Sequence, residues 1–133
     1  MNNITKTMYK TIAIVLCLSM LFIAHPIKAS AATYGNGTTV TDNSKTSASF
    51  SFTVPQSFGS GTLYVRALSS SNSGSFATFV IRRNNVQVWQ DMIQMNGSDY
   101  SAVVSGWQGG TYTVTFSFPK NSANLQIAAS VKN

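Results

Sequence analysis

The sequence has few side chains that perform acid–base, nucleophilic or metal chemistry. Its 133 residues include one cysteine, one histidine, three aspartates and no glutamate. Cys17 and His25 both precede residue 33, so the rest of the chain has no thiol or imidazole to act as nucleophile, general base or zinc ligand. It also has no cysteine pair for a disulfide, and its stability must come from an apolar core. These absences exclude most catalytic constellations.

The three aspartates, Asp42, Asp91 and Asp99, are the only acidic side chains. Two carboxylates can act as acid and base in glycoside hydrolysis, and calcium takes about 6 to 8 oxygen ligands. However, Asp42 lies in the polar stretch 33–45, and Asp91 and Asp99 flank the turn predicted at residues 92–96. No dense acidic loop exists. We therefore expect no catalytic residue, no metal site and no cofactor.

The N-terminal segment, residues 1–32, has the composition of a secretory signal peptide. It has Lys6 and Lys10 near its start, then the apolar run 12–24, and it ends with the small residues 29–32. An apolar run of about 13 residues is shorter than the roughly 20 needed to cross a bilayer as a helix. We therefore predict cleavage after Ala31 or Ala32, no permanent membrane anchor, and a secreted, extracellular protein.

Removing this segment changes the charge balance. Three of the nine Lys and Arg residues precede residue 33, so the remainder carries six cations against three aspartates, a net charge of +3. Arg66, Arg82 and Arg83 could gather into a basic patch for an anionic cell-wall polymer or nucleic acid, but arginines on sheet faces are more often simply solvated. We expect no nucleic-acid partner.

From residue 46 onward, apolar residues alternate with Ser, Thr and other polar residues, the period-2 pattern of strands with one buried face. The pattern occurs in seven short runs separated by Ser-, Gly- and Asn-rich turns: 46–54, 62–68, 76–83, 86–95, 100–104, 111–118 and 124–132. We therefore predict that residues 46–133 form a small antiparallel β-sandwich, immunoglobulin-like or jelly-roll, preceded by a flexible polar arm at residues 33–45.

Two pairs of neighbouring runs are predicted to form β-hairpins. Asn84 and Asn85 tolerate the left-handed backbone of a tight reversal between the third and fourth runs. The second hairpin spans residues 100–118 and turns at residues 105–110. In its second strand one face is apolar, and we expect this face to lie in the core: Tyr112, Val114, Phe116 and Phe118.

The segment Gly109-Gly-Thr-Tyr-Thr-Val-Thr115 resembles the penultimate strand of many secreted bacterial β-sandwich accessory modules, including pre-peptidase C-terminal domains. In those modules a Gly-Thr-Tyr signature precedes a buried strand. The resemblance covers about 40 residues and implies a secreted accessory module with this architecture. The resemblance does not identify any ligand-binding residue in this chain.

The strongest candidate for ligand contact is Trp107, which lies in the glycine-rich turn 105–110 beside Gln108. A flat indole next to an amide suits stacking on a sugar or a peptide. We therefore predict Trp107 and Gln108 as ligand-binding residues. The alternative is that the ring folds back over the end of the sandwich as a packing residue.

These features predict a secreted, non-catalytic binding or structural module that acts at the cell surface or extracellularly, with a glycan or cell-wall polymer as its partner. The alternative is a secreted cationic antimicrobial or membrane-active protein. It is motivated by the positive charge and by Tyr34-Gly-Asn-Gly37, which resembles the opening motif of pediocin-like bacteriocins. That family continues with Val and a cysteine pair, whereas this chain has Thr38 and no cysteine. The same four residues are also typical of a turn.

Overall fold

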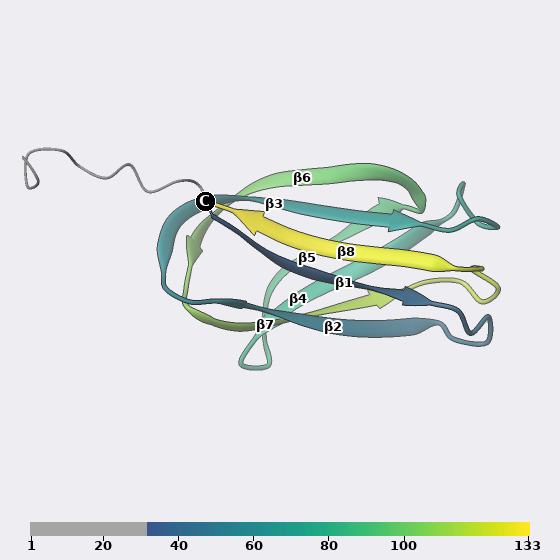
Figure 1. The fold of residues 1–133 in the computed structure, drawn as a ribbon, viewed down its shortest axis with the longest axis horizontal. Coiled ribbons are helices and arrows are strands. Elements are labelled where there is room, and N and C mark those ends of the chain that lie inside the picture. Colours follow the sequence, from purple (N-terminus) through teal and green to yellow (C-terminus); the bar gives the residue numbers. More distant parts are fainter. Residues whose placement is uncertain (1–31) are drawn as a thin grey trace, which may run out of the picture. The chain divides into compact units, whose positions relative to one another are not determined.

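The computed structural model describes residues 32–133, which form an all-β domain (Figure 1). All of the predicted signal peptide except Ala32 lies outside the described residues. The domain has eight strands: β1 (Thr33–Val40), β2 (Ser47–Val54), β3 (Phe58–Leu68), β4 (Phe76–Arg83), β5 (Val86–Gln94), β6 (Asn96–Trp107), β7 (Gly110–Ser117) and β8 (Leu125–Lys132). Across residues 32–133 there is no helix of sufficient length and hydrophobicity to traverse a membrane.

The strands form two antiparallel four-stranded sheets, in the orders β1-β8-β3-β6 and β2-β7-β4-β5. We call them the β3 sheet and the β7 sheet. Between residues 32 and 133, β4 and β5 are the only consecutive strands that pair, and every other connection passes from one sheet to the other. Eight strands that alternate between two sheets in this order form a jelly roll. The structure therefore confirms the predicted sandwich and selects the jelly-roll alternative.

The core lies between the two sheets and is built by the alternation seen in the sequence. Every second side chain is buried along most of β2, β3, β4, β7 and β8, which includes the apolar face predicted for residues 112–118. β1, β5 and β6 each bury one side chain. Aromatic rings from three strands meet at its centre, where Phe116 lies 6.1 Å from Phe50 and 5.9 Å from Phe79, measured between ring centroids. The outward positions of β2 and β7 are Ser and Thr, and three cross-strand hydroxyl pairs connect them.

The hairpin predicted at Asn84 and Asn85 is confirmed. Both residues have positive φ, 52° and 62°, the left-handed backbone that a two-residue reversal between twisted strands requires. Arg83 pairs with Val86 across the turn, and the register shifts by one residue after Ile81. This bulge bends the hairpin close to its tip.

The hairpin predicted for residues 100–118 is wrong, although both of its strands exist. β6 pairs with β3 in one sheet, whereas β7 pairs with β2 and β4 in the other. The segment at Gln108 and Gly109 is therefore a connection between the sheets. The Tyr112 hydroxyl accepts from the Gln108 N–H and donates to the Gln108 carbonyl, at 3.0 and 2.7 Å. The Arg83 guanidinium donates two hydrogen bonds to the Gly109 carbonyl.

The flexible arm predicted at residues 33–45 is also wrong, because Thr33–Val40 forms edge strand β1, which pairs with β8 along its whole length. Its glycines fit this position: a Cβ at Gly35 would lie 2.5 Å from the Cβ of Ser130, closer than side chains can approach. Asn36 donates from Nδ2 to the Ser51 carbonyl at 3.0 Å and so links β1 to edge strand β2 of the other sheet. β1 is therefore part of the sandwich, upstream of the predicted boundary at residue 46.

Candidate functional site

The exposed face of the β3 sheet presents one aromatic ring near its centre. Leu63 and Val65 of β3 point into the core, so Tyr64 points outward, as the alternation predicts, and its side chain is 39% exposed. Its direct cross-strand partners are Ser101 on β6 and Ser130 on β8. Both neighbours are small and leave part of the phenol ring accessible to solvent.

On one side of this ring, the sheet surface is nearly free of side chains. Ala128 and Ser130 are the two central outward residues of β8, between Gln126 and Lys132, and they lie opposite Gly37 and Gly35 of β1. The four positions therefore form a floor of backbone and small groups beside Tyr64. A flat floor next to an exposed ring can accept a planar or chain-like ligand.

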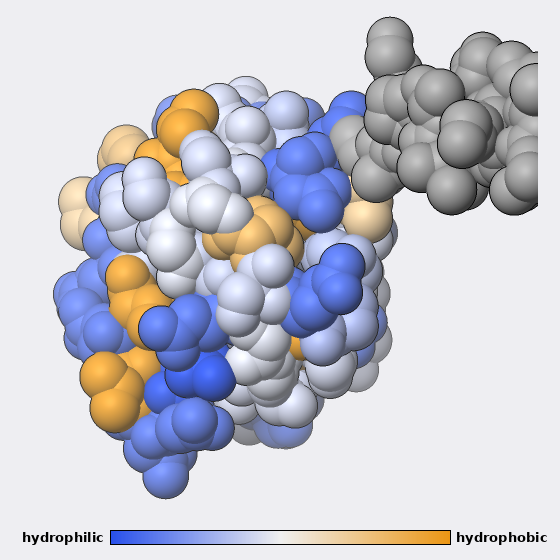
Figure 2. Space-filling view, turned by 90° about the vertical axis from the view of Figure 1, so that its left-hand side faces the viewer, coloured by the Kyte–Doolittle hydropathy of each residue, from blue (hydrophilic) through white to orange (hydrophobic). Residues whose placement is uncertain are grey.

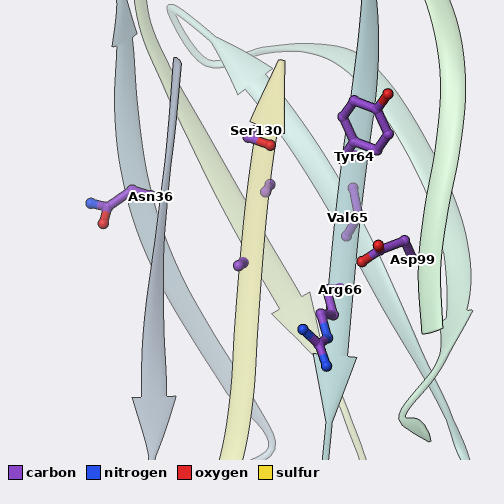
Figure 3. Close-up of a pocket in the computed structure, with 8 residues that line it drawn as sticks. Asn36, Tyr64, Val65, Arg66, Asp99 and Ser130 are labelled. Carbon is purple, nitrogen blue, oxygen red and sulfur yellow. The ribbon is translucent and has the colours of Figure 1, made fainter. Parts of the chain in front are cut away.

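Two opposite charges lie at one end of this floor. Arg66 and Asp99 are direct cross-strand partners on β3 and β6, and both are exposed. Figure 3 shows the Asp99 carboxylate turned toward β3, while the Arg66 guanidinium points away from it along β3. Within residues 32–133 neither side chain forms a hydrogen bond or an ion pair, so both remain available to a ligand.

These elements line a shallow hollow, shown in Figure 3, which we call the Tyr64 groove and define by Tyr64, Arg66, Asp99, Ala128 and Ser130. Its volume is about 230 Å³, below the roughly 300 to 1,000 Å³ of pockets that enclose a small molecule. The groove is therefore suited to contact one or two units of a longer chain that continues over the sheet.

The structure does not bring the predicted site residues Trp107 and Gln108 to this groove. Trp107 ends β6, six residues beyond Ser101, and is only 4% exposed. Its ring lies against Phe58 and Tyr112, with centroid distances of 6.1 and 5.1 Å. This is the geometry of the packing alternative, in which the indole folds over the end of the sandwich. Ligand binding by Trp107 and Gln108 stays a prediction.

The indole of Trp107 nevertheless has an unusual environment. Its Nε1 is the one buried side-chain nitrogen or oxygen in residues 32–133 that has no hydrogen-bond partner. The ring also borders a notch of about 250 Å³ between edge strands β5 and β6, together with Trp89 and Tyr112. Gln108 is exposed, and it is fixed through its backbone by the Tyr112 hydroxyl.

The three aspartates lie on different elements: Asp42 follows β1, Asp91 lies on β5, and Asp99 lies on β6 of the other sheet. Asp91 accepts a hydrogen bond from the Tyr100 hydroxyl at 2.7 Å, and that hydroxyl accepts from Trp89 Nε1 at 3.2 Å. The bond from Tyr100, with a second from the Met92 N–H, lowers the pKa of Asp91 below its ordinary value of 3.8. Partial burial and the neighbouring carboxylate raise the pKa of Tyr100. Across the described strands and loops, no three His, Cys, Asp or Glu side chains come together.

Comparison with known proteins gives similarity at the level of fold. No family model matches the sequence, and no curated protein is similar to it. One similar solved structure is the pre-peptidase C-terminal domain of collagenase from Bacillus anthracis, with 13% identity and a TM-score of 0.43 over 73% of this chain and 84% of that domain. Another is dimeric latent PorU from Porphyromonas gingivalis, with 10% identity and a TM-score of 0.41 over 78% of this chain and 13% of PorU. The structural neighbours thus include a domain of the kind that the segment from Gly109 to Thr115 resembles.

Proposed function

We propose that the protein is a secreted, non-catalytic module that binds a glycan, such as a cell-wall polysaccharide, through the Tyr64 groove. The observation that carries this proposal is the exposed Tyr64 ring above a floor of small residues, flanked by the unpaired charges of Arg66 and Asp99. A sugar ring can stack on the phenol. Its hydroxyls can accept from the guanidinium and donate to the carboxylate.

A single stacking ring and a shallow groove imply weak binding per sugar unit. An aromatic contact contributes on the order of 1 kcal/mol, which corresponds to about a fivefold change in affinity. Useful retention on a polymer therefore requires several contacts along the chain or several copies of the module. Insoluble polysaccharide, which presents many equivalent units, is accordingly the appropriate assay material.

The experiment compares retention of the purified protein and its variants on insoluble cell-wall polysaccharide. Tyr64→Ala should weaken retention about fivefold, because it removes the stacking surface without touching the core. Phe76→Ala is the matched control: Phe76 is also an exposed aromatic, at 55%, but it lies on the other sheet. Equal retention of Tyr64→Ala and wild-type protein would overturn the groove as the binding site.

The same assay tests the site predicted from the sequence. Gln108→Ala removes an exposed amide and leaves the two backbone hydrogen bonds to Tyr112 in place, so the variant should stay folded. Loss of retention in Gln108→Ala, with Tyr64→Ala unaffected, would move the site to the connection between β6 and β7. Killing or permeabilisation of indicator bacteria by the purified protein would instead support the antimicrobial alternative.

A further inference from the structure

One edge of the β7 sheet is unpaired, and the hairpin that forms it exposes several apolar side chains among polar ones. β5 pairs only with β4, so the backbone groups along its other edge have no strand partner in residues 32–133. The Met92 N–H donates to the Asp91 carboxylate at 2.8 Å, and a partner strand would have to replace this bond. Six large apolar side chains of this domain are exposed, and four of them lie on the β4–β5 hairpin: Phe76, Val86, Val88 and Met92. Figure 2, which faces the end of the sandwich at the left of Figure 1, shows apolar side chains reaching the surface between hydrophilic ones.

The other edge strands lack this combination. Edge strands β1 and β2, which belong to different sheets, contact each other. The Asn36 side chain also donates a hydrogen bond to the Ser51 carbonyl of β2. The outward residues of β6 are mostly polar or charged, with Val103 as the exception. Lysine, proline, bulges and inward-pointing charges keep an unpaired edge from adding another strand. β5 has a bulge near the hairpin tip and Asp91, but it has no lysine or proline.

The sequence of β5 is close to self-complementary. The segment Gln90-Asp91-Met92-Ile93-Gln94 lies beyond the bulge and has regular pairing with β4. If two copies pair antiparallel about Met92, each Met92 faces its counterpart and each Gln90 faces a Gln94, whose amides can bond to each other. Asp91 then lies opposite Ile93, so no like charges meet.

We propose that β5 is a dimerisation edge, at which a second copy of this chain adds its own β5 antiparallel about Met92. The two β7 sheets then form one continuous eight-stranded sheet, with a two-fold axis between the Met92 residues. One strand edge buries little area, so the dimer is weak and concentration-dependent. This inference is independent of the Tyr64 groove, although a dimer would present two such grooves and increase retention by avidity.

The absence of cysteine after residue 32 permits a direct test with Met92→Cys. Directly opposed residues of an antiparallel pair have Cα atoms roughly 4.5 to 5.5 Å apart, within the range that a disulfide spans. Met92→Cys should form a covalent dimer under mild oxidation. Val103→Cys is the matched control, because Val103 is a 73% exposed apolar residue on β6, an edge strand of the other sheet. Cross-linking of Val103→Cys at the same rate as Met92→Cys would overturn the proposal.

Sedimentation velocity of the protein without an introduced cysteine provides the second readout. Wild-type protein should dimerise as its concentration rises, whereas Met92→Lys should stay monomeric because two lysines would face each other across the axis. Val103→Lys should dimerise like wild type. Thermal melts of both lysine variants should match wild type, since Met92 and Val103 lie outside the core. A wild-type protein that stays monomeric at the highest attainable concentration would contradict the proposal.

Discussion

Phe116→Ala tests the packing of the core most directly. The Phe116 ring is fully buried and lies against the rings of Phe50 and Phe79. Truncation of a buried phenylalanine removes its transfer free energy and leaves a cavity, at a cost of about 3 to 5 kcal/mol. The total stability of such a domain is of the order of 5 to 15 kcal/mol, so the variant should lose a large share of it.

The preceding residue supplies the control. Thr115 points to the opposite face of β7, where its hydroxyl pairs with that of Ser49 at 2.9 Å. Thr115→Ala should therefore cost only about 0.5 to 1 kcal/mol. Urea denaturation followed by tryptophan fluorescence measures both values. Equal costs for the two variants would refute the inward assignment of β7, because a shift of one residue exchanges the two faces of a strand.

Three further predictions concern individual contacts. Tyr112→Phe should cost about 1 to 2 kcal/mol in denaturant melts, because both hydrogen bonds that fix Gln108 are lost; an unchanged midpoint would contradict this role. Gly35→Val should lower the melting temperature, since a Cβ there would lie 2.5 Å from that of Ser130; no change would favour a free arm. The pKa of Asp91 is lowered in the folded protein, so its carboxylate stabilises the fold above pH 3.8 and this contribution disappears as the pH falls through the lowered pKa. The difference in unfolding free energy between wild type and Asp91→Asn should therefore shrink on acidification. A difference that grows would mean that folding raises the pKa of Asp91.

Much of the local structure could be predicted because it depends on neighbouring residues. Alternation in β3 and β7 identified which side chains enter the core, and Asn84-Asn85 identified the one hairpin. Strand pairing is different, because it is decided between distant segments. A Gly-rich turn such as residues 105–110 can reverse the chain within a sheet or carry it to the other sheet, and the hydrophobic pattern of the flanking strands is the same in both cases.

β1 was missed because glycine and asparagine have low strand propensity. Glycine is needed at positions 35 and 37 because β8 approaches so closely that a Cβ would clash with it. This contact with a distant segment is not visible in the local sequence. The Tyr64 groove was missed for a similar reason. The alternation predicts that Tyr64 and Arg66 point outward, but their neighbours Ser130 and Asp99 are brought to them by the strand order β1-β8-β3-β6.

The central claim, that the protein binds glycan through the Tyr64 groove, is tested most directly by mapping amide chemical shifts while a soluble cell-wall oligosaccharide is added. Shift changes should concentrate at Tyr64, Arg66, Asp99 and Ser130, the residues that line the groove. They should be clearly smaller in Tyr64→Ala at the same oligosaccharide concentration, because its affinity is expected to be about fivefold lower. Shift changes confined to the connection that contains Gln108, or to the Ser- and Thr-rich face of the β7 sheet, would contradict the claim.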